Sequence, residues 1–148
     1  MSKPLRQPLT SEELRELAAR LRQAFQSVSE LKKKPGGTAI QYPKLPSVFS
    51  ESLVVVCGPA LFPNAKNIHL GGGHEADVVF DSSNVTKKVE VKATGSKEFQ
   101  EFGPRDVKAD FLVWIAFGSV FENESEDTIR IYVLDEPRRV FPMGRRSL

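Results

Sequence analysis

Residues 75–92 read EADVVFDSSNVTKKVEVK. Hydrophobic and polar residues alternate over 75–81 and again over 86–94, and this period of two is typical of β-strands. Between the two stretches lie small polar residues that favour tight turns, at 82–84. The sequence therefore predicts a β-hairpin.

The position of the turn sets which residues of the hairpin face one another. A tight turn at 83–84 places Asp77 opposite Glu90 and, one pair further out, Glu75 opposite Lys92. Side chains two residues apart on a strand share a face, so all four are expected on the same side. Directly opposed Cβ atoms lie about 4.5 to 5.5 Å apart. Asp77 and Glu90 are therefore expected within reach of one shared cation.

Two opposed carboxylates repel each other, and a divalent metal would neutralise them. Oxygen ligands favour Mg²⁺, with Mn²⁺ as a substitute, over zinc. Lys92 would then hold or polarise a water beside the metal. The alternative is an exposed, merely charged hairpin face, in which Glu75 and Lys92 form an ion pair worth less than about 1 kcal/mol.

These residues resemble the active-site signature of the PD-(D/E)XK nuclease superfamily, in which an acidic residue opens one hairpin strand and Glu-x-Lys lies in the next. Asp77, Glu90 and Lys92 match the three catalytic positions, whereas Ala76 stands where the motif name has Pro. The resemblance implies an α/β fold with a restriction-endonuclease-like core, a central mixed β-sheet flanked by helices. It also implies that Asp77, Glu90 and an acid on a preceding helix, Glu51, bind the metal.

The resemblance further implies Mg²⁺-dependent hydrolysis of double-stranded DNA, as in a small type II restriction endonuclease acting as a homodimer. The alternatives are a Holliday-junction resolvase or another structure-specific nuclease, a non-catalytic DNA-binding module on the same fold, and a protein-interaction domain. DNA contacts are expected from Lys97, Arg105 and Lys108, each of which is equally compatible with solvated surface. His74 is a further candidate for orienting a water or contacting a phosphate, although a lone His in a loop more often does neither.

Helices are predicted before the hairpin. A capping box of Thr10 and Glu13 opens an apolar repeat of three and four residues, which predicts a helix over 10–34. Over 47–56, a helix capped by Ser47 competes with a buried strand, because three consecutive Val residues are β-branched.

The other segments are predicted from turn residues and apolar runs. Gly, Pro and Asn indicate a long connection over 58–74, and a loop with a short helix is expected over 98–109. The apolar run 111–117 predicts a central strand buried on both faces, and a last alternating strand is expected over 128–134.

The 148 residues are 40% hydrophobic, which excludes a disordered chain, and their number predicts a single domain over 1–148. The resemblance implies that this is a nuclease domain. Its expected parts are the helix 10–34, a catalytic core of about 47–134 and a basic tail at 137–148. One Cys and two His are too few for a disulfide framework or a Cys-rich zinc module. The sequence also shows no membrane-spanning run and no signal peptide, so a cytoplasmic protein is expected.

Overall fold

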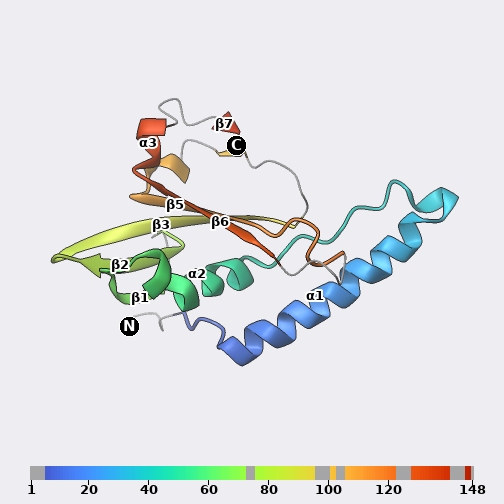
Figure 1. Cartoon of the computed structure of the whole chain (residues 1–148), viewed down its shortest axis with the longest axis horizontal. Coiled ribbons are helices and arrows are strands. Elements are labelled where there is room, and N and C mark those ends of the chain that lie inside the picture. Colours follow the sequence, from blue (N-terminus) through green and yellow to red (C-terminus); the bar gives the residue numbers. More distant parts are fainter. Residues whose placement is uncertain are drawn as a thin grey trace.

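The computed structural model describes residues 6–72, 76–95, 101–102, 106–122, 128–140 and 146–147. A mixed sheet has the strand order β1-β2-β3-β5-β6 (Figure 1). β2 is antiparallel to both of its neighbours, β3 and β5 are parallel, and β6 is antiparallel to β5. The predicted α/β class with a central mixed sheet is therefore confirmed. The strands of this sheet are β1 (Lys66–Leu70), β2 (Val78–Ser82), β3 (Val85–Thr94), β5 (Phe111–Ala116) and β6 (Arg130–Asp135).

The β2–β3 hairpin has the predicted register. Its pairs run from Ser82 with Val85, next to the turn, to Val78 with Val89. The two turn residues, Ser83 and Asn84, have φ values of 50° and 64°. Positive φ at both central positions gives a turn whose twist matches that of the flanking strands. Local turn chemistry thus sets the alignment of the hairpin.

Helix α1 (Ser11–Lys32) begins where the sequence predicts it. The Thr10 side chain accepts a hydrogen bond from the Glu13 backbone N–H, and the Glu13 side chain accepts one from the Thr10 N–H. A short 3₁₀ turn, η1 (Pro35–Gly37), follows the helix. The residues that α1 buries against the core lie on one face: Leu14, Leu21 and Phe25.

Helix α2 (Ser47–Leu61) resolves the choice between helix and strand in favour of the helix. Burial of its apolar face outweighs the weak helix preference of β-branched Val. The predicted Ser47 cap is wrong, because Pro46 is the N-cap residue and no side chain caps the helix. Ser47 is instead the first helical residue, and its carbonyl accepts a hydrogen bond from Ser50 Oγ.

The prediction of a long connection over 58–74 is also wrong. Helix α2 continues through Pro59 to Leu61, and β1 pairs with β2 across a bulge between Lys66 and His69. Asn67, inside the bulge, has a φ of 55°, a conformation that Asn tolerates better than most residues. The turn-forming residues therefore shape an irregular edge strand as well as a loop.

Two hydrophobic clusters cover the faces of the sheet. The larger one packs α1 and α2 against one face, and the smaller one joins Leu112, Trp114 and Val107 on the other. Strand β5 is buried on both faces, as predicted. On the side of the smaller cluster, Figure 1 shows elements that include η2 (Asp106–Lys108), α3 (Pro137–Val140) and the pair β4 (Glu101–Phe102) and β7 (Arg146–Ser147).

The predicted short helix in 98–109 corresponds, within the described residues, to η2. The last strand begins at Arg130 rather than Thr128. Of the helices that the structure describes, none combines the length and apolar character needed to cross a membrane.

Candidate active site

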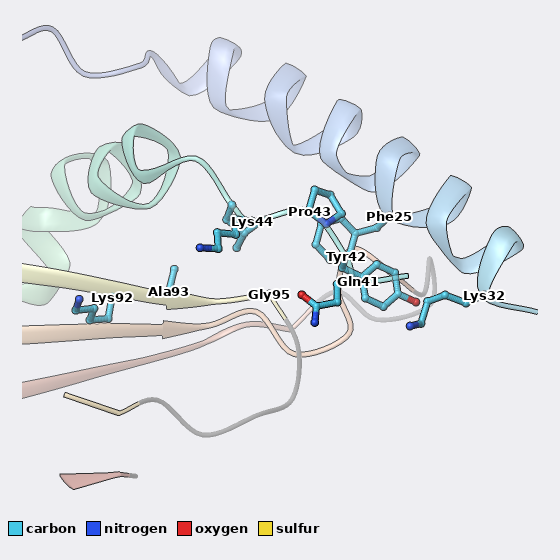
Figure 2. A pocket seen from close by; sticks show the side chains of 10 residues that line it. Phe25, Lys32, Gln41, Tyr42, Pro43, Lys44, Lys92, Ala93 and Gly95 are labelled. Atoms are coloured by element: carbon cyan, nitrogen blue, oxygen red, sulfur yellow. The ribbon is translucent and has the colours of Figure 1, made fainter. Parts of the chain in front are cut away.

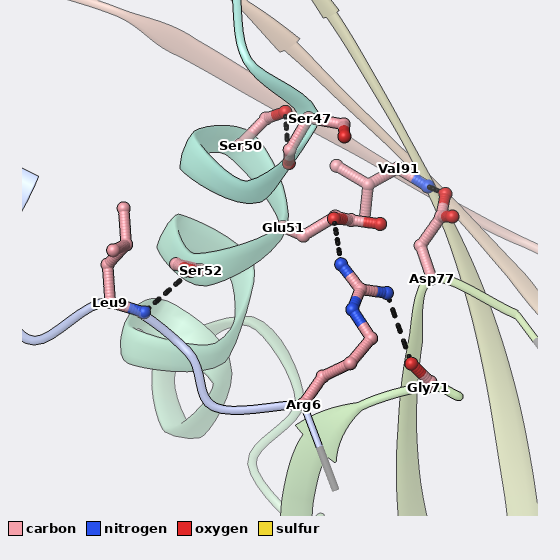
Figure 3. Close-up of polar contacts among 9 residues, drawn as sticks. All are labelled: Arg6, Leu9, Ser47, Ser50, Glu51, Ser52, Gly71, Asp77 and Val91. Carbon is pink, nitrogen blue, oxygen red and sulfur yellow. Dashed lines mark hydrogen bonds and ion pairs between the residues drawn. The ribbon is translucent and has the colours of Figure 1, made fainter. Parts of the chain in front are cut away.

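A buried carboxylate lies where α2 packs on the hairpin. Glu51, near the start of α2, is only 5% exposed. Its Oε2 atom lies 2.9 Å from Nη2 of Arg6, and Nη1 of Arg6 donates a hydrogen bond to the Gly71 carbonyl at 3.1 Å (Figure 3). The chain after Arg6 is held on the same helix, because Leu9 N–H donates to Ser52 Oγ. The segment from Arg6 to Leu9 is therefore bound to α2 by two side-chain contacts.

Asp77 lies at the point where the hairpin opens. It directly precedes β2, and its Oδ2 accepts a hydrogen bond of 2.9 Å from the backbone N–H of Val91 on β3. Val91 lies beyond the last β2–β3 pair, Val78 with Val89, so the carboxylate continues the ladder where β2 has ended. Figure 3 shows Glu51 and Asp77 near Val91, with the Asp77 carboxylate directed to the Val91 nitrogen. The two carboxyl groups are close enough for the charge of Asp77 to act on Glu51. The fold therefore brings two acids together from α2 and the hairpin.

The electrostatics of Glu51 reflect this closeness. Burial raises the pKa of its carboxyl above the ordinary value of 4.5, and the charge of Asp77 and a hydrogen bond with it raise the pKa further. The hydrogen bond and the charge of Arg6 act in the opposite direction and lower this pKa. Arg6 therefore compensates part of the cost of keeping a charged Glu51 beside Asp77.

Glu90 and Lys92 lie on the opposite face of the sheet from Glu51. Val91 belongs to the core on the α2 side, so its two neighbours project to the other face. The pairing with β5 agrees, because Lys92 is aligned with Trp114, which packs in the smaller cluster. Both Glu90 and Lys92 are partly buried and make contacts there.

A bend in the chain at Asp77 explains why Asp77 and Glu90 do not face one another although the hairpin has the predicted register. The chain bends at Asp77, just before β2, and the side chain turns to the edge of β3 instead of continuing the alternation of the strand. Across the described ranges, no group of three or more His, Cys, Asp and Glu side chains is placed to hold a metal ion. Of the three predicted metal ligands, the structure brings together Glu51 and Asp77 and places Glu90 on the other face.

The predicted DNA contacts are only partly described. Lys108 is exposed at the end of η2. Three others, His74, Lys97 and Arg105, lie outside the described residues, as does Glu75. Sequence reasoning missed Arg6, because its partner Glu51 is 45 residues away and no periodicity links them.

The donor set fits a hard divalent cation. Two carboxylates converge, and Mg²⁺ is commonly held by one or two carboxylates together with waters and substrate phosphates. The Arg6 guanidinium already supplies positive charge beside Glu51, so a metal ion at this site would have to share or displace that ion pair. Comparison of the chain with family models, with curated proteins and with solved structures gave no significant match.

Proposed function

We propose that this chain is a Mg²⁺-dependent DNA endonuclease with a restriction-endonuclease-like core, acting on double-stranded DNA as a small type II restriction enzyme does. The observation that carries the proposal is that buried Glu51 lies beside Asp77, at the open end of the hairpin just before β2 begins. The order of elements supports it, since a helix, a hairpin and a buried strand parallel to β3 follow one another as the motif leads one to expect.

In this proposal Glu51 and Asp77 hold the metal. Mg²⁺, or Mn²⁺ in its place, supplies a Lewis acid for the scissile phosphate and lowers the pKa of a bound water. The Val91 N–H fixes the orientation of the Asp77 carboxylate. Arg6 holds Glu51 in place, and its hydrogen bond and charge favour the carboxylate form against burial and the charge of Asp77, which raise the pKa of Glu51.

Glu90 and Lys92 act in this proposal from the other side of β3. β2 pairs with β3 only as far as Val89, and beyond that point no strand among the described residues pairs with this edge of β3. A substrate at this edge would meet side chains from both faces of the sheet. Lys92 then supports negative charge that develops on the phosphate.

A second candidate is a DNA-binding module that does not cleave. Two observations favour it: Arg6 already neutralises Glu51, and Glu90 and Lys92 lie across the sheet from the acid pair. This candidate keeps the fold and the basic groups but needs no metal. The two candidates therefore differ in chemistry rather than in architecture.

Cleavage of supercoiled plasmid with Mg²⁺, Mn²⁺, Ca²⁺ or chelator separates them. We expect nicked or linear DNA with the first two metals, and none with Ca²⁺ or chelator. Glu51→Gln and Asp77→Asn should each lower the rate by several orders of magnitude. Glu16→Gln, which alters an exposed carboxylate paired with Arg20, is the matched control and should cleave normally.

The outcomes have distinct meanings. Cleavage that persists after exhaustive metal removal would contradict the metal site. A salt-sensitive gel shift without cleavage under any metal would establish the non-catalytic module. Sequencing of the ends from a long defined DNA, compared with cleavage of branched substrates, distinguishes a restriction enzyme from a junction resolvase. Sedimentation with and without DNA tests the homodimer expected for a double-strand cut.

A further inference from the structure

A basic groove lies beside the candidate active site, between α1, the segment before α2 and the end of β3. It has a volume of about 890 Å³. Among the described residues that line it, three are lysines, Lys32, Lys44 and Lys92, and none is Asp or Glu. We call it the lysine groove. All of its described charged lining residues are positive, although the net charge of the whole chain is only +2. Such a local excess of positive charge favours an anionic ligand.

The wall of the groove is held in place by aromatic packing. The Tyr42 ring stacks on Phe25, with centroids 4.9 Å apart and an interplanar angle of 11°. The Tyr42 hydroxyl shares a hydrogen bond of 2.7 Å with Ser29 Oγ. Lys32 Nζ lies 5.4 Å from the Tyr42 centroid and donates to the Ile40 carbonyl at 2.6 Å. Lys32 is therefore positioned before any ligand arrives.

The same packing argues against recognition of bases. Phe25 covers one face of Tyr42, and the Lys32 ammonium lies over the ring. A base that stacks on an aromatic platform needs a free ring face. The groove therefore offers charge rather than stacking, which suits phosphates better than bases.

The positions of the lysines fit an extended ligand. Figure 2 shows Lys92 at one end of the groove, Lys32 at the other and Lys44 between them. The Lys92 end adjoins Val91, whose N–H holds Asp77. The Lys92 side chain projects to the other face of the sheet from Glu51, so the row reaches the edge of β3 next to Val91 rather than the acid pair itself. A row of cations matches a chain of phosphates better than a compact ligand with a single charge centre.

We propose that the lysine groove binds the phosphodiester backbone of a DNA strand as it leaves the Glu51–Asp77 site, and does so without reading its sequence. The inference rests on the proposed DNA-directed function and adds the path of the strand. Each lysine that contacts a phosphate releases counterions, so the binding constant should fall steeply with salt. Sequence preference, in contrast, should not depend on the groove.

The test measures binding without cleavage. A fluorescent duplex and a fluorescent single strand are titrated with protein in Ca²⁺ buffer, at a series of NaCl concentrations, by fluorescence anisotropy. The variants are Lys32→Gln, Lys44→Gln and the pair combined. The matched control combines Lys66→Gln and Lys88→Gln, which removes the same charge from exposed positions outside the groove. Circular dichroism and thermal unfolding check that each variant is folded.

We expect each groove substitution to reduce the slope of log K against log salt by about one. The combined groove variant should bind at least about tenfold more weakly at low salt, equally for different DNA sequences, while the control pair stays close to the parent protein. Equal effects of the two pairs would show that only general surface charge matters, and would overturn the proposal. Unchanged affinity and slope in the groove pair would overturn it as well.

The same experiment separates this inference from the proposed cleavage. Glu51→Gln and Asp77→Asn should retain the groove-dependent salt slope although they cannot cleave. If cleavage fails in the parent protein while the slope still depends on Lys32 and Lys44, the groove stands and the nuclease proposal falls. If the parent protein cleaves but the slope of log K against log salt is the same in the Lys32 and Lys44 variants, the groove proposal is wrong and the nuclease proposal is unaffected.

Discussion

Replacing Arg6 with Ala removes the cation that lies against the Glu51 carboxylate. Glu51 would then remain buried beside Asp77 without its ion pair. The segment itself should stay docked, because the hydrogen bond from Leu9 N–H to Ser52 Oγ is untouched. Arg6→Ala therefore tests the electrostatics of the acid pair with little change in packing.

The magnitude follows from the unequal exposure of the two partners. The Glu51 side chain is 6% exposed and that of Arg6 is 43% exposed. Breaking a fully buried pair costs about 3 to 5 kcal/mol, whereas an exposed pair contributes about 0.2 to 1 kcal/mol. Because only one partner is buried, we expect Arg6→Ala to lower the free energy of unfolding by about 1 to 3 kcal/mol at pH 8.

The loss should depend on pH in a definite direction. The pKa of Glu51 in the folded chain is above its ordinary value of 4.5. Between these two values the folded state binds more protons than the unfolded state, so stability falls as pH rises through this window. Arg6 lowers this pKa, and its removal extends the window upward. The destabilisation should therefore be smaller at pH 5 than at pH 8.

Urea denaturation followed by circular dichroism, in chelator at pH 5 and pH 8, measures these differences. In a Glu51→Gln background, Arg6→Ala should cost little and show no such pH dependence, which a double-mutant cycle would reveal. The control is Arg20→Ala, whose exposed pair with Glu16 should contribute less than about 0.5 kcal/mol. An equal loss at both pH values, or an unchanged loss without the Glu51 carboxyl, would show that Arg6 does not act through the charge of Glu51.

Three further predictions concern packing and metal binding. Gly58→Ala should lower stability by about 1 to 3 kcal/mol in thermal unfolding, because the added Cβ would overlap the Ile68 side chain; no loss would mean that β1 shifts freely. Trp114→Phe should cost about 1 to 2 kcal/mol in urea, because it removes the 3.0 Å hydrogen bond to Thr94 Oγ1, and a preceding Thr94→Val change should shrink this effect. Mn²⁺ binding measured by calorimetry should be lost in Asp77→Asn, and retention of full affinity would place the metal elsewhere.

The hairpin and the first helix could be predicted because local interactions decide them. Alternation and the turn at 83–84 set the register of the hairpin, and the capping box sets the start of α1. Each depends on residues only a few positions apart, so the unfolded chain already carries the preference. The buried strand β5 was also predictable, because few other elements accommodate a short continuous apolar run.

The segments that were wrongly predicted depend on tertiary partners. β1 has no strong alternation of its own, and it is a strand because β2 lies beside it to accept and donate hydrogen bonds. Similarly, α2 extends through Pro59 because its flanks pack on the sheet, which offsets the lost backbone hydrogen bond. Secondary-structure propensity depends on neighbouring residues only and does not include such tertiary contacts.

Local sequence is enough to establish which acids are present and which residues pair along the hairpin. It does not reveal that Glu51, rather than Glu90, lies beside Asp77, or that Arg6 forms an ion pair with Glu51, because both depend on how distant segments pack. Strand alternation holds only while the ladder continues. At Asp77 the ladder ends, the chain bends, and the direction of the carboxylate is set by the Val91 N–H and the helix packed above it.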